Sequence, residues 1–295
     1  CLVSTRARLM PRVVVVGDVI DDILVKPKTV IRPDTDTQAE IKLTPGGSAA
    51  NFACWLANRG VSVDFVGRVN HKDVARHLQD LESFGVNPLL QADPKLATGS
   101  IVVLVEGEQR SFLTDRGANK NLDVSEIEDF GDALYLSGYS LFGAMPAKDF
   151  KALIRRAKAQ GAMVVCDPGS AGFIADYGVV KFFEATKGVD LFTPSLEEGR
   201  VLTGELDPRL IAFNLLERYP MVALTLGKEG ILVAHKNEAT LIPAKKVKVV
   251  DSTGAGDATT ASLVADLVNG VDFDQAAKNA VIAGANAVTR SGGRP

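Results

Sequence analysis

Several features that mark particular classes of protein are absent from this sequence. Positive charge is not in excess: the formal net charge is −3 at pH 7, which argues against a nucleic-acid-binding surface because such a surface needs a basic excess. No apolar run approaches the length of a membrane span. The three cysteines are scattered, with no paired spacing. A disulfide framework is therefore not expected, and a reducing, cytoplasmic setting is the simplest interpretation.

Two familiar nucleotide-binding motifs are also missing. A P-loop needs Gly-Lys followed by Ser or Thr, and no such tripeptide occurs. A dinucleotide fingerprint has three glycines directly after the first strand, whereas the nearest pattern, at 254–259, is close to the C-terminus and lacks the third glycine. The opening segment 1–9 lacks the apolar core of a signal peptide. We expect Met10 to be the natural start and residues 1–9 to lie upstream of it.

What the sequence does contain is an alternation of strands and helices. Helical periodicity lies between several short apolar runs that are rich in β-branched residues. This order predicts an α/β fold with a mostly parallel sheet covered by helices on both faces, and ligands of such folds bind beyond the carboxyl ends of the strands. The predicted strands are 12–20, 61–67, 133–138, 162–169, 189–195 and 221–227, and the predicted helices are 48–59, 71–84, 147–160, 195–204 and 208–218.

Two segments depart from this alternation. Segment 22–45 has the pattern of a β-hairpin with proline punctuation, and segment 98–119 has two alternating strands around Glu106-Gly107-Glu108. We predict that both segments join in a small β-sheet that projects from the main domain as a lid. The main α/β domain would then consist of 12–21, 46–97 and 120–295.

A glycine-rich turn enters an apolar helix in "DSTGAGDATTASLVADLVNG" (251–270). Amide groups at a helix start are unpaired, and glycines let an anion approach them closely. Gly254, Ala255 and Gly256 are therefore candidates for an anion hole. The alternative is structural, because a carboxylate such as Asp257 stabilises the start of any helix. The helix start alone does not decide between the two interpretations.

Four motifs, in this order along the chain, resemble those of the ribokinase-like (pfkB-type) carbohydrate kinases. "PGGSAANFA" (45–53) is similar to the family's glycine-pair motif, and "ALTLGKEG" (223–230) to its nucleotide-binding strand and turn. "DSTGAGD" (251–257) matches its anion-hole motif at every fixed position, and "AVTRSGG" (287–293) is similar to its cation loop. The resemblance extends from about Val13 to the end and implies a three-layer α/β/α domain with a small β-sheet lid.

The resemblance implies a catalytic role for the anion-hole motif. Asp257 would be the base that takes a proton from the substrate hydroxyl, which attacks the γ-phosphoryl group of ATP. A base with an ordinary low pKa suffices for such a reaction, because its transition state is loose and the proton is transferred late. The amides of Gly254, Ala255 and Gly256 would hold the developing negative charge.

The same resemblance implies a sugar site at Asp22, Gly46, Gly47 and Asn51. The structural alternatives are a hairpin-start residue for Asp22 and a plain loop for the two glycines. Ile20 stands where ribokinase has asparagine, which puts ribose itself in doubt.

Nucleotide and metal positions are implied as well. Thr225, Gly227 and Gly230 match positions of the nucleotide loop. Ser195 and Glu198 stand at the family's N-x-x-E motif, which is tied to Mg²⁺ and phosphate, with serine in place of asparagine. A monovalent-cation site, expected to take K⁺, would use oxygen ligands from Asp251, Thr253, Val288, Ser291 and Gly293.

The substrate stays open at this stage. No Phe, Tyr or Trp lies between Asp22 and Asn51, which favours a sugar over a nucleoside that needs stacking partners. A phospho-sugar remains possible because the predicted lid region holds several cations: Lys26, Lys28, Arg32, Arg110 and Arg116. Arg116 fits a place near the substrate and an exposed lid position equally well.

Two further alternatives concern the whole protein. A non-catalytic sugar-binding or regulatory protein on the same fold is the competing class, and the intact Gly-Ala-Gly-Asp at 254–257 argues against it. A projecting sheet has edges and an apolar face that need cover. We therefore expect a homodimer that forms through the lids.

Overall fold

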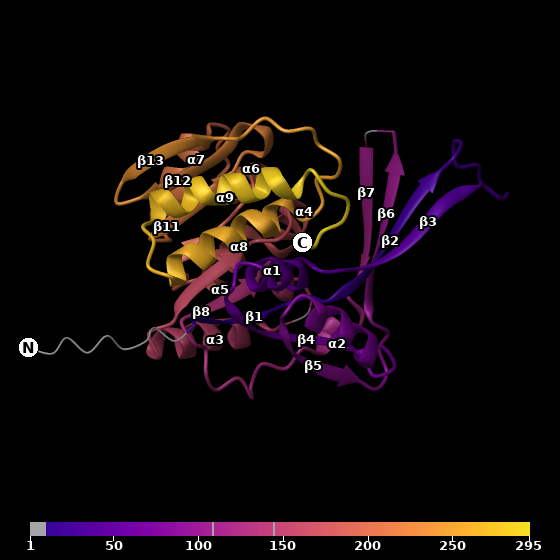
Figure 1. The fold of residues 1–295 in the computed structure, drawn as a ribbon, viewed down its shortest axis with the longest axis horizontal. Helices are drawn as coiled ribbons and strands as arrows, with labels where there is room; N and C mark the ends of the chain where they lie inside the picture. The colour runs from indigo at the N-terminus through magenta and orange to yellow at the C-terminus, as the bar shows by residue number, and fades with distance from the viewer. Residues whose placement is uncertain (1–9, 108, 144) are drawn as a thin grey trace, which may run out of the picture.

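The computed structural model describes residues 10–107, 109–143 and 145–295. The segment 1–9, expected to precede the natural start, and Glu108, in the predicted turn of the lid, lie outside the described residues. Figure 1 shows the elements in the order β1 (Arg12–Val16), β2 (Ile20–Pro27), β3 (Ala39–Gly46), α1 (Ser48–Ala57), β4 (Ser62–Asn70), α2 (Val74–Ser83), β5 (Asn87–Asp93), β6 (Gly99–Glu106), β7 (Gln109–Asp115), η1 (Gly117–Asn121), β8 (Ala133–Ser137), η2 (Gly138–Leu141), α3 (Ala147–Ala159), β9 (Met163–Asp167), α4 (Ala171–Tyr177), α5 (Val179–Ala185), β10 (Leu191–Phe192), α6 (Leu196–Thr203), α7 (Pro208–Leu216), β11 (Met221–Thr225), η3 (Gly227–Glu229), β12 (Gly230–His235), β13 (Glu238–Pro243), α8 (Ala255–Val268) and α9 (Phe273–Ala287).

A nine-stranded sheet runs through the main body in the order β13-β12-β11-β10-β9-β8-β1-β4-β5. The pairs from β11 through β10, β9, β8, β1 and β4 to β5 are all parallel, whereas β12 and β13 add an antiparallel edge. The predicted α/β class with a mostly parallel central sheet is therefore confirmed.

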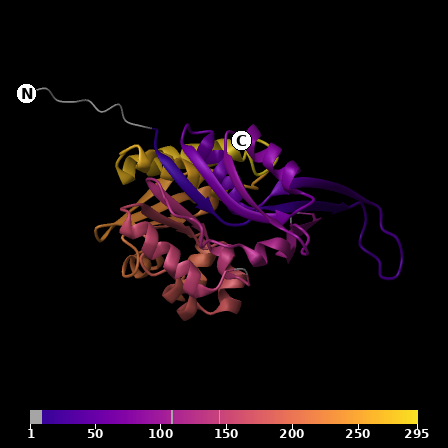
Figure 2. The ribbon, with the colours of Figure 1, turned by 90° about the horizontal axis from the view of Figure 1, so that it is seen from below.

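Strand β1 shows why the predicted strands are apolar on both sides. Val13 and Val15 pack into the core under α1, α2, α8 and α9. Val14 and Val16 pack into a second core under the helices from α3 to α7. A strand between two helical layers must bury alternate residues in opposite directions, so its apolar run is continuous. Figures 1 and 2 show the two helical layers on either side of the sheet.

All six predicted strands are present, as are the five predicted helices. The sequence analysis missed the edge strand β5, the antiparallel pair β12 and β13, and the helices α4, α5 and α9. Helix α9 packs through small residues such as Ala276, Ala277 and Ala280, all fully buried. Small side chains in close contact with α8 give little contrast between a buried and an exposed face, so the helical period was weak.

The two departing segments form a separate four-stranded sheet in the order β3-β2-β6-β7. Both predicted hairpins are antiparallel, and β2 joins them by pairing parallel to β6. Strand β2 begins at Ile20, two residues before the predicted segment. Figure 1 shows this small sheet projecting from the main body, and Figure 2 shows its β2–β3 hairpin reaching furthest out.

The register of the small sheet separates its two faces. Ile23 pairs directly with Leu43 and with Val102, and Val102 pairs with Leu113, so these four side chains share one face. Asp22 and its partner Thr44 lie on the opposite face. Leu43 is 60 % exposed and Leu113 is 63 % exposed. One face of the small sheet is therefore apolar and uncovered in the single chain.

Within 10–107, 109–143 and 145–295, no helix combines the length and the apolar character that crossing a bilayer requires.

Candidate active site

Polar side chains gather where the strands of the large sheet end. Ser137, Asp167 and Thr225 are the last residues of β8, β9 and β11, and Asp18 follows β1. These strands are successive or near neighbours in the sheet, so the four residues stand along one edge. This is the edge at which parallel α/β sheets bind ligands.

Asp18 fixes the start of helix α1 at this edge. Its carboxylate accepts hydrogen bonds from the amide of Ser48 at 2.9 Å, from the amide of Ala49 at 3.4 Å and from the Ser137 hydroxyl at 3.0 Å. Asp18 is buried, and these donors compensate the burial of its charge. The sequence analysis missed Asp18, although a carboxylate directly after the first apolar strand was a usable signal.

Asp257 lies in the first turn of α8 and faces α1. The hydroxyl of Ser48 donates a hydrogen bond to Oδ1 of Asp257 at 2.8 Å. Burial raises the pKa of Asp257 to about 7, with a further rise from Asp18, although the hydrogen bond from Ser48 lowers it. An ordinary low pKa would suffice for the reaction, but the pKa of this carboxyl is higher because the group is enclosed beside another acid.

Two glycines at the start of α8, Gly254 and Gly256, have different surroundings. Gly254 has φ +74°, and a Cβ there would lie 2.3 Å from the carbonyl oxygen of Gly293. Gly256 is exposed, and a Cβ there would meet nothing within 4 Å. The amide of Ala255 donates to the carbonyl of Ser252 at 3.3 Å. Open space in front of a helix start at Gly256 is compatible with the expected anion hole.

The glycine pair Gly46-Gly47 leaves room for the carboxyl group of Asp22 and for the backbone of Asp18. A Cβ on Gly46 would lie 2.4 Å from the carboxyl oxygens of Asp22, and a Cβ on Gly47 would lie 2.5 Å from the carbonyl of Asp18. Gly47 also has φ +99°, which is unfavourable for other residues. Burial and the charge of Asp18 raise the pKa of Asp22 to about 6. The structure thus brings Asp22, Gly46 and Gly47 together, as expected.

Asn51 is buried beside this pair, but its side chain already has a partner. Its Oδ1 accepts a hydrogen bond from Nε of Arg294 at 3.1 Å. Arg294 also donates to the carbonyl of Gly46 at 3.2 Å and forms an ion pair with Asp80. The sequence analysis missed Arg294, because a contact across 243 positions leaves no local signal.

Ser195 and Glu198 also meet, in an arrangement that explains both residues structurally. They form a capping box at the start of α6, in which Ser195 N donates to Glu198 Oε2 at 2.7 Å and Glu198 N donates to Ser195 Oγ at 3.4 Å. Burial raises the pKa of Glu198. To bind Mg²⁺ or phosphate as expected, the two side chains would have to do so while they form this capping box, or break it.

Asp167, which is partly buried at the end of β9, is a further acid that the sequence analysis did not select. Burial, followed by the charges of Glu198 and Asp257, raises its pKa well above the usual range. A carboxyl whose pKa is raised by neighbouring acids favours a cation beside it, and hard carboxylate oxygens suit Mg²⁺. No set of three or more His, Cys, Asp or Glu in the described part of the chain has metal-binding geometry, so a Mg²⁺ ion here would need phosphate or water oxygens as well.

The expected nucleotide residues lie around the end of β11. Thr225 pairs with Ser195 in a parallel bridge, and its hydroxyl donates to the carbonyl of Pro194 at 3.5 Å. Gly230 has φ +111°, and a Cβ there would lie 2.0 Å from the carbonyl of Ile242, so strand β13 alone explains this glycine. Gly227 has φ +58° and leaves open space.

The residues of the expected cation site also come together, but their oxygens have other partners. The carbonyl of Val288 accepts the amides of Val250 and Asp251 at 2.8 and 3.2 Å. The Asp251 carboxylate accepts the amides of Thr253 at 3.0 Å and Gly292 at 3.1 Å. The carbonyl of Gly293 accepts Trp55 Nε1 at 2.8 Å. The only expected ligands left without such a bond in the described residues are the carbonyls of Thr253 and Ser291. To bind K⁺, the other oxygens would have to use a second lone pair or give up a hydrogen bond.

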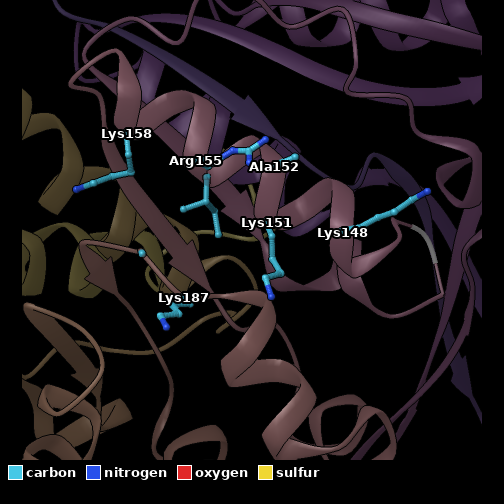
Figure 3. A pocket seen from close by; sticks show the side chains of 8 residues that line it. Lys148, Lys151, Ala152, Arg155, Lys158 and Lys187 are labelled. Carbon is cyan, nitrogen blue, oxygen red and sulfur yellow. The ribbon is translucent and has the colours of Figure 1, made fainter.

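A cavity of about 550 Å³ lies elsewhere, along α3 and the connection between α5 and β10. Its lining is basic, but Lys158 forms an ion pair with Asp190, and Lys151 lies 3.9 Å from Glu184. Figure 3 shows Lys148 and Lys158 at opposite ends and pointing apart. Helix α3 packs on the sheet face opposite α8, so this cavity is separate from the site at Asp257.

Comparison with known proteins decides the family. The family described as pfkB family carbohydrate kinase matches residues 10–295. The chain belongs to this family.

Individual relatives agree with this assignment. A fructokinase of Vibrio alginolyticus is 28% identical over 279 residues, which cover 90% of this chain and 86% of that protein. An adenosine kinase structure from Sinorhizobium meliloti has a TM-score of 0.86 at 22% identity and covers 97% of this chain and 96% of its own. A fructokinase structure from Vibrio cholerae O395, with fructose, ADP and calcium ion bound, has a TM-score of 0.81 at 28% identity. The match covers 96% of this chain and 94% of that chain. The ribokinase-like fold implied by the motifs is thereby confirmed.

Proposed function

We propose that this protein is an ATP-dependent sugar kinase with Asp257 as its general base. The observation that carries the proposal is the position of Asp257, which combines the first turn of α8, the hydrogen bond to Ser48 and the open helix start at Gly256. A pKa of about 7 suits a general base, because base catalysis is most efficient when the pKa lies near the working pH.

The reaction balances with this one base. The substrate hydroxyl oxygen forms a bond to the γ-phosphorus of ATP, and its proton passes to the Asp257 carboxylate. The bond from the γ-phosphorus to the β–γ bridging oxygen breaks, and its electron pair leaves with ADP. The amides at Gly254, Ala255 and Gly256 would stabilise the charge on the transferred group, with Ala255 exchanging its bond to Ser252.

A divalent cation, Mg²⁺ in our proposal, would neutralise charge on the phosphates of ATP. The carboxyls of Asp167 and Glu198 support its place, since burial and the charge of Glu198 raise the pKa of Asp167. The expected nucleotide residues Ser195, Thr225, Gly227 and Gly230 adjoin these acids along the sheet edge. No step is assigned to K⁺, because the oxygens expected to bind it accept other hydrogen bonds.

The substrate site is proposed at Asp22, Gly46, Gly47 and Asn51. The similar fructokinase structure with bound fructose and ADP supports a sugar. A nucleoside is less well supported, because the guanidinium of Arg116 already covers the ring of Tyr139, with 4.5 Å from its carbon to the ring centroid. Asn51 would have to exchange its bond to Arg294 for one to the sugar.

The small sheet is proposed to act as the lid and as the dimer interface. Arg110 of β7 reaches Asp251 at 3.4 Å, which links the small sheet to the loop before α8. The uncovered apolar face with Leu43 and Leu113 supports a homodimer. Free, buried Cys54 and Cys166 and the use of ATP support a cytoplasmic setting.

One pair of variants tests the proposed function. We expect the wild type to convert ATP to ADP with at least one sugar in a panel of pentoses, hexoses, sugar phosphates and nucleosides. Asp257→Asn should lower kcat by about 10²–10⁴-fold, the usual value of general-base assistance, with little change in ATP affinity. Asp274→Asn, an exposed acid in the first turn of α9, is the matched control and should keep full activity. A sugar-binding protein without kinase activity would bind a panel member and leave ATP intact.

A further inference from the structure

A buried arginine without a hydrogen-bond partner lies beside the proposed substrate site. Arg116, between β7 and η1, is 7 % exposed. Its Nη2 is fully buried and has no hydrogen-bond acceptor. Across the described residues, its guanidinium takes part in no hydrogen bond or ion pair. Buried charged groups are nearly always paired because desolvation is costly, so this arginine calls for an explanation.

Two aromatic rings hold the guanidinium in place. Its central carbon lies 4.5 Å from the ring centroid of Tyr139 and 5.2 Å from that of Phe173. The two rings stand at 78° to each other and enclose the guanidinium from two sides. Such contacts are attractive for a cation, but they supply no oxygen acceptor, so the five N–H donors of the group keep no hydrogen-bond partner among the described residues.

Two acids of this region, Asp115 and Asp18, bond other groups and form no ion pair with Arg116. Asp115, the preceding residue, accepts the amide of Gly117 at 3.1 Å and the ammonium group of Lys120 at 3.1 Å. The carboxylate of Asp18 accepts hydrogen bonds from α1 and from Ser137. The protein thus buries and orients a positive charge here without supplying its counter-charge.

The position belongs to the substrate end of the site. The side chain of Asn119, three residues after Arg116, bonds the amide and the carbonyl of Val19 at 3.2 and 3.1 Å. Val19 lies between Asp18 and strand β2, which carries Asp22. Burial, followed by the charges of Asp18 and Glu198, raises the pKa of Tyr139, so the ring under the guanidinium lies near the acids of the site.

We propose that the sugar phosphorylated by this kinase carries an anionic group, a phosphate or a carboxylate, and that Arg116 binds this group through the free edge of its guanidinium. Arginine suits such groups because its planar N–H groups match their oxygens. The proposal rests on the proposed kinase function and names its substrate class. The phosphoryl transfer itself is unchanged, since the anionic group takes no part in bond making or breaking.

Turnover of matched sugars tests the proposal. The probes are fructose, fructose 6-phosphate and gluconate, each with ATP and Mg²⁺, so that the two anionic probes distinguish a phosphate from a carboxylate. We expect the wild type to prefer one anionic probe over fructose by about 10- to 150-fold in kcat/KM, the value of one charge-assisted hydrogen bond. Arg116→Met should abolish this preference and leave kcat/KM for fructose within about threefold. Arg116→Lys should restore part of it, since the charge returns without the planar fork.

Controls separate substrate binding from a structural role. Arg155→Met makes the same change on the exposed side of α3 and should leave the preference intact. Equal activity with neutral and anionic probes in the wild type would overturn the proposal. So would a loss in Arg116→Met that is equal for all three probes, or one that falls on the KM for ATP, since these outcomes mean a structural or nucleotide-binding role.

Binding measurements keep the proposal testable if no transfer is observed. Calorimetric titration of the wild type and Arg116→Met with the same probes asks the question without catalysis. Anion-selective binding that Arg116→Met removes would support the anion site even if the kinase function failed. Kinase activity on fructose, together with no anion-selective binding, would overturn the anion site and leave the kinase function standing.

Discussion

The nine-stranded sheet lies between two helical layers, whereas the four-stranded sheet projects from the main body (Figure 1). Residues of β1 such as Val13 and Val15 are fully buried, but Leu43 and Leu113 of the small sheet are more than half exposed. The acids gather between the two sheets, with Asp18 and Asp167 on the large one and Asp22 on the small one. The large sheet can therefore hold charged groups in a rigid enclosure. The small sheet adds Asp22 to these groups, and its apolar face stays exposed in the single chain.

This difference has an electrostatic consequence. At the end of the large sheet, burial raises the pKa of Asp257 to about 7, and at the base of the small sheet it raises the pKa of Asp22 to about 6. Both acids cost the folded protein stability when they ionise. Ionised acids in this enclosure destabilise the protein without ligand. A ligand that brings cations or hydrogen-bond donors would stabilise these carboxylates.

The largest effect is expected from removing the buried charge of Asp257. Its pKa is about 7 in the folded protein, against a usual value of 3.8, so the folded state keeps a proton that the unfolded state releases. This contribution to stability is complete below pH 3.8 and is lost as the pH rises through 7. Asp257→Asn should therefore be more stable than the wild type at pH 8, by up to about 4 kcal/mol, since each pKa unit is about 1.4 kcal/mol.

Urea unfolding at pH 4, 6 and 8 measures this difference, which should shrink towards zero at pH 4. Asp149→Asn removes another first-turn acid, that of α3, and should change stability by less than about 1 kcal/mol. A difference between Asp257→Asn and wild type that does not vary with pH would contradict the raised pKa.

The second prediction concerns Asp22, on the opposite face of the small sheet from Leu43. Asp22→Ala should lower kcat/KM for the sugar by about ten- to a few-hundredfold, because charge-assisted hydrogen bonds are worth about 1.5–3 kcal/mol. The KM for ATP should change little. Asp21→Ala is the matched control, since its side chain points to the other face and forms an ion pair with Arg76 at 2.8 Å. If ATP affinity fell and sugar affinity did not, the sugar site would be misplaced.

The apolar face of the same sheet gives the third prediction. Leu43→Asp should weaken the proposed dimer by about ten- to a hundredfold, because two copies of a half-exposed leucine lose their burial. Lys42→Asp, which places the same acid on the opposite face, should have a smaller effect. Sedimentation at several protein concentrations distinguishes the variants. A wild-type protein that is monomeric at micromolar concentration would exclude this interface.

The sequence predicted the large sheet better than the site at its edge. A parallel strand such as β1 is buried on both faces, so it needs a short, continuous apolar run. This run was enough to predict a strand at β1 from the sequence. The capping box joins Ser195 and Glu198, which are only three residues apart, so it could also have been predicted from the sequence. The sequence analysis interpreted the two residues only through the family motif. The motifs therefore located Asp257, Asp22 and the glycine pair, whose neighbours along the chain carry the signal.

What the sequence could not predict depends on contacts between distant segments. Asp18 takes its role from Ser48 and Ser137, and Arg294 reaches Asn51 across most of the chain. The raised pKa of Asp257 likewise arises from burial by several elements rather than from its motif. Arg116 was left between an exposed lid position and a substrate position, because the rings of Tyr139 and Phe173, which its guanidinium contacts, follow later in the chain.

The smallest effect is expected from exchanging K⁺ for a bulky organic cation. The carboxylate of Asp251 is held by amide hydrogen bonds and by Arg110 from the small sheet, and the carbonyl of Val288 accepts two amides. A cation that binds here would mainly take the place of the Arg110 guanidinium beside the Asp251 carboxylate, and this ion pair is partly exposed. Such pairs are worth about 0.2–1 kcal/mol, so kcat should change by less than about fivefold. A loss of a hundredfold or more in tetramethylammonium would show that the two loops rearrange around K⁺, and Arg110→Met should then reduce that dependence because it frees Asp251 in advance.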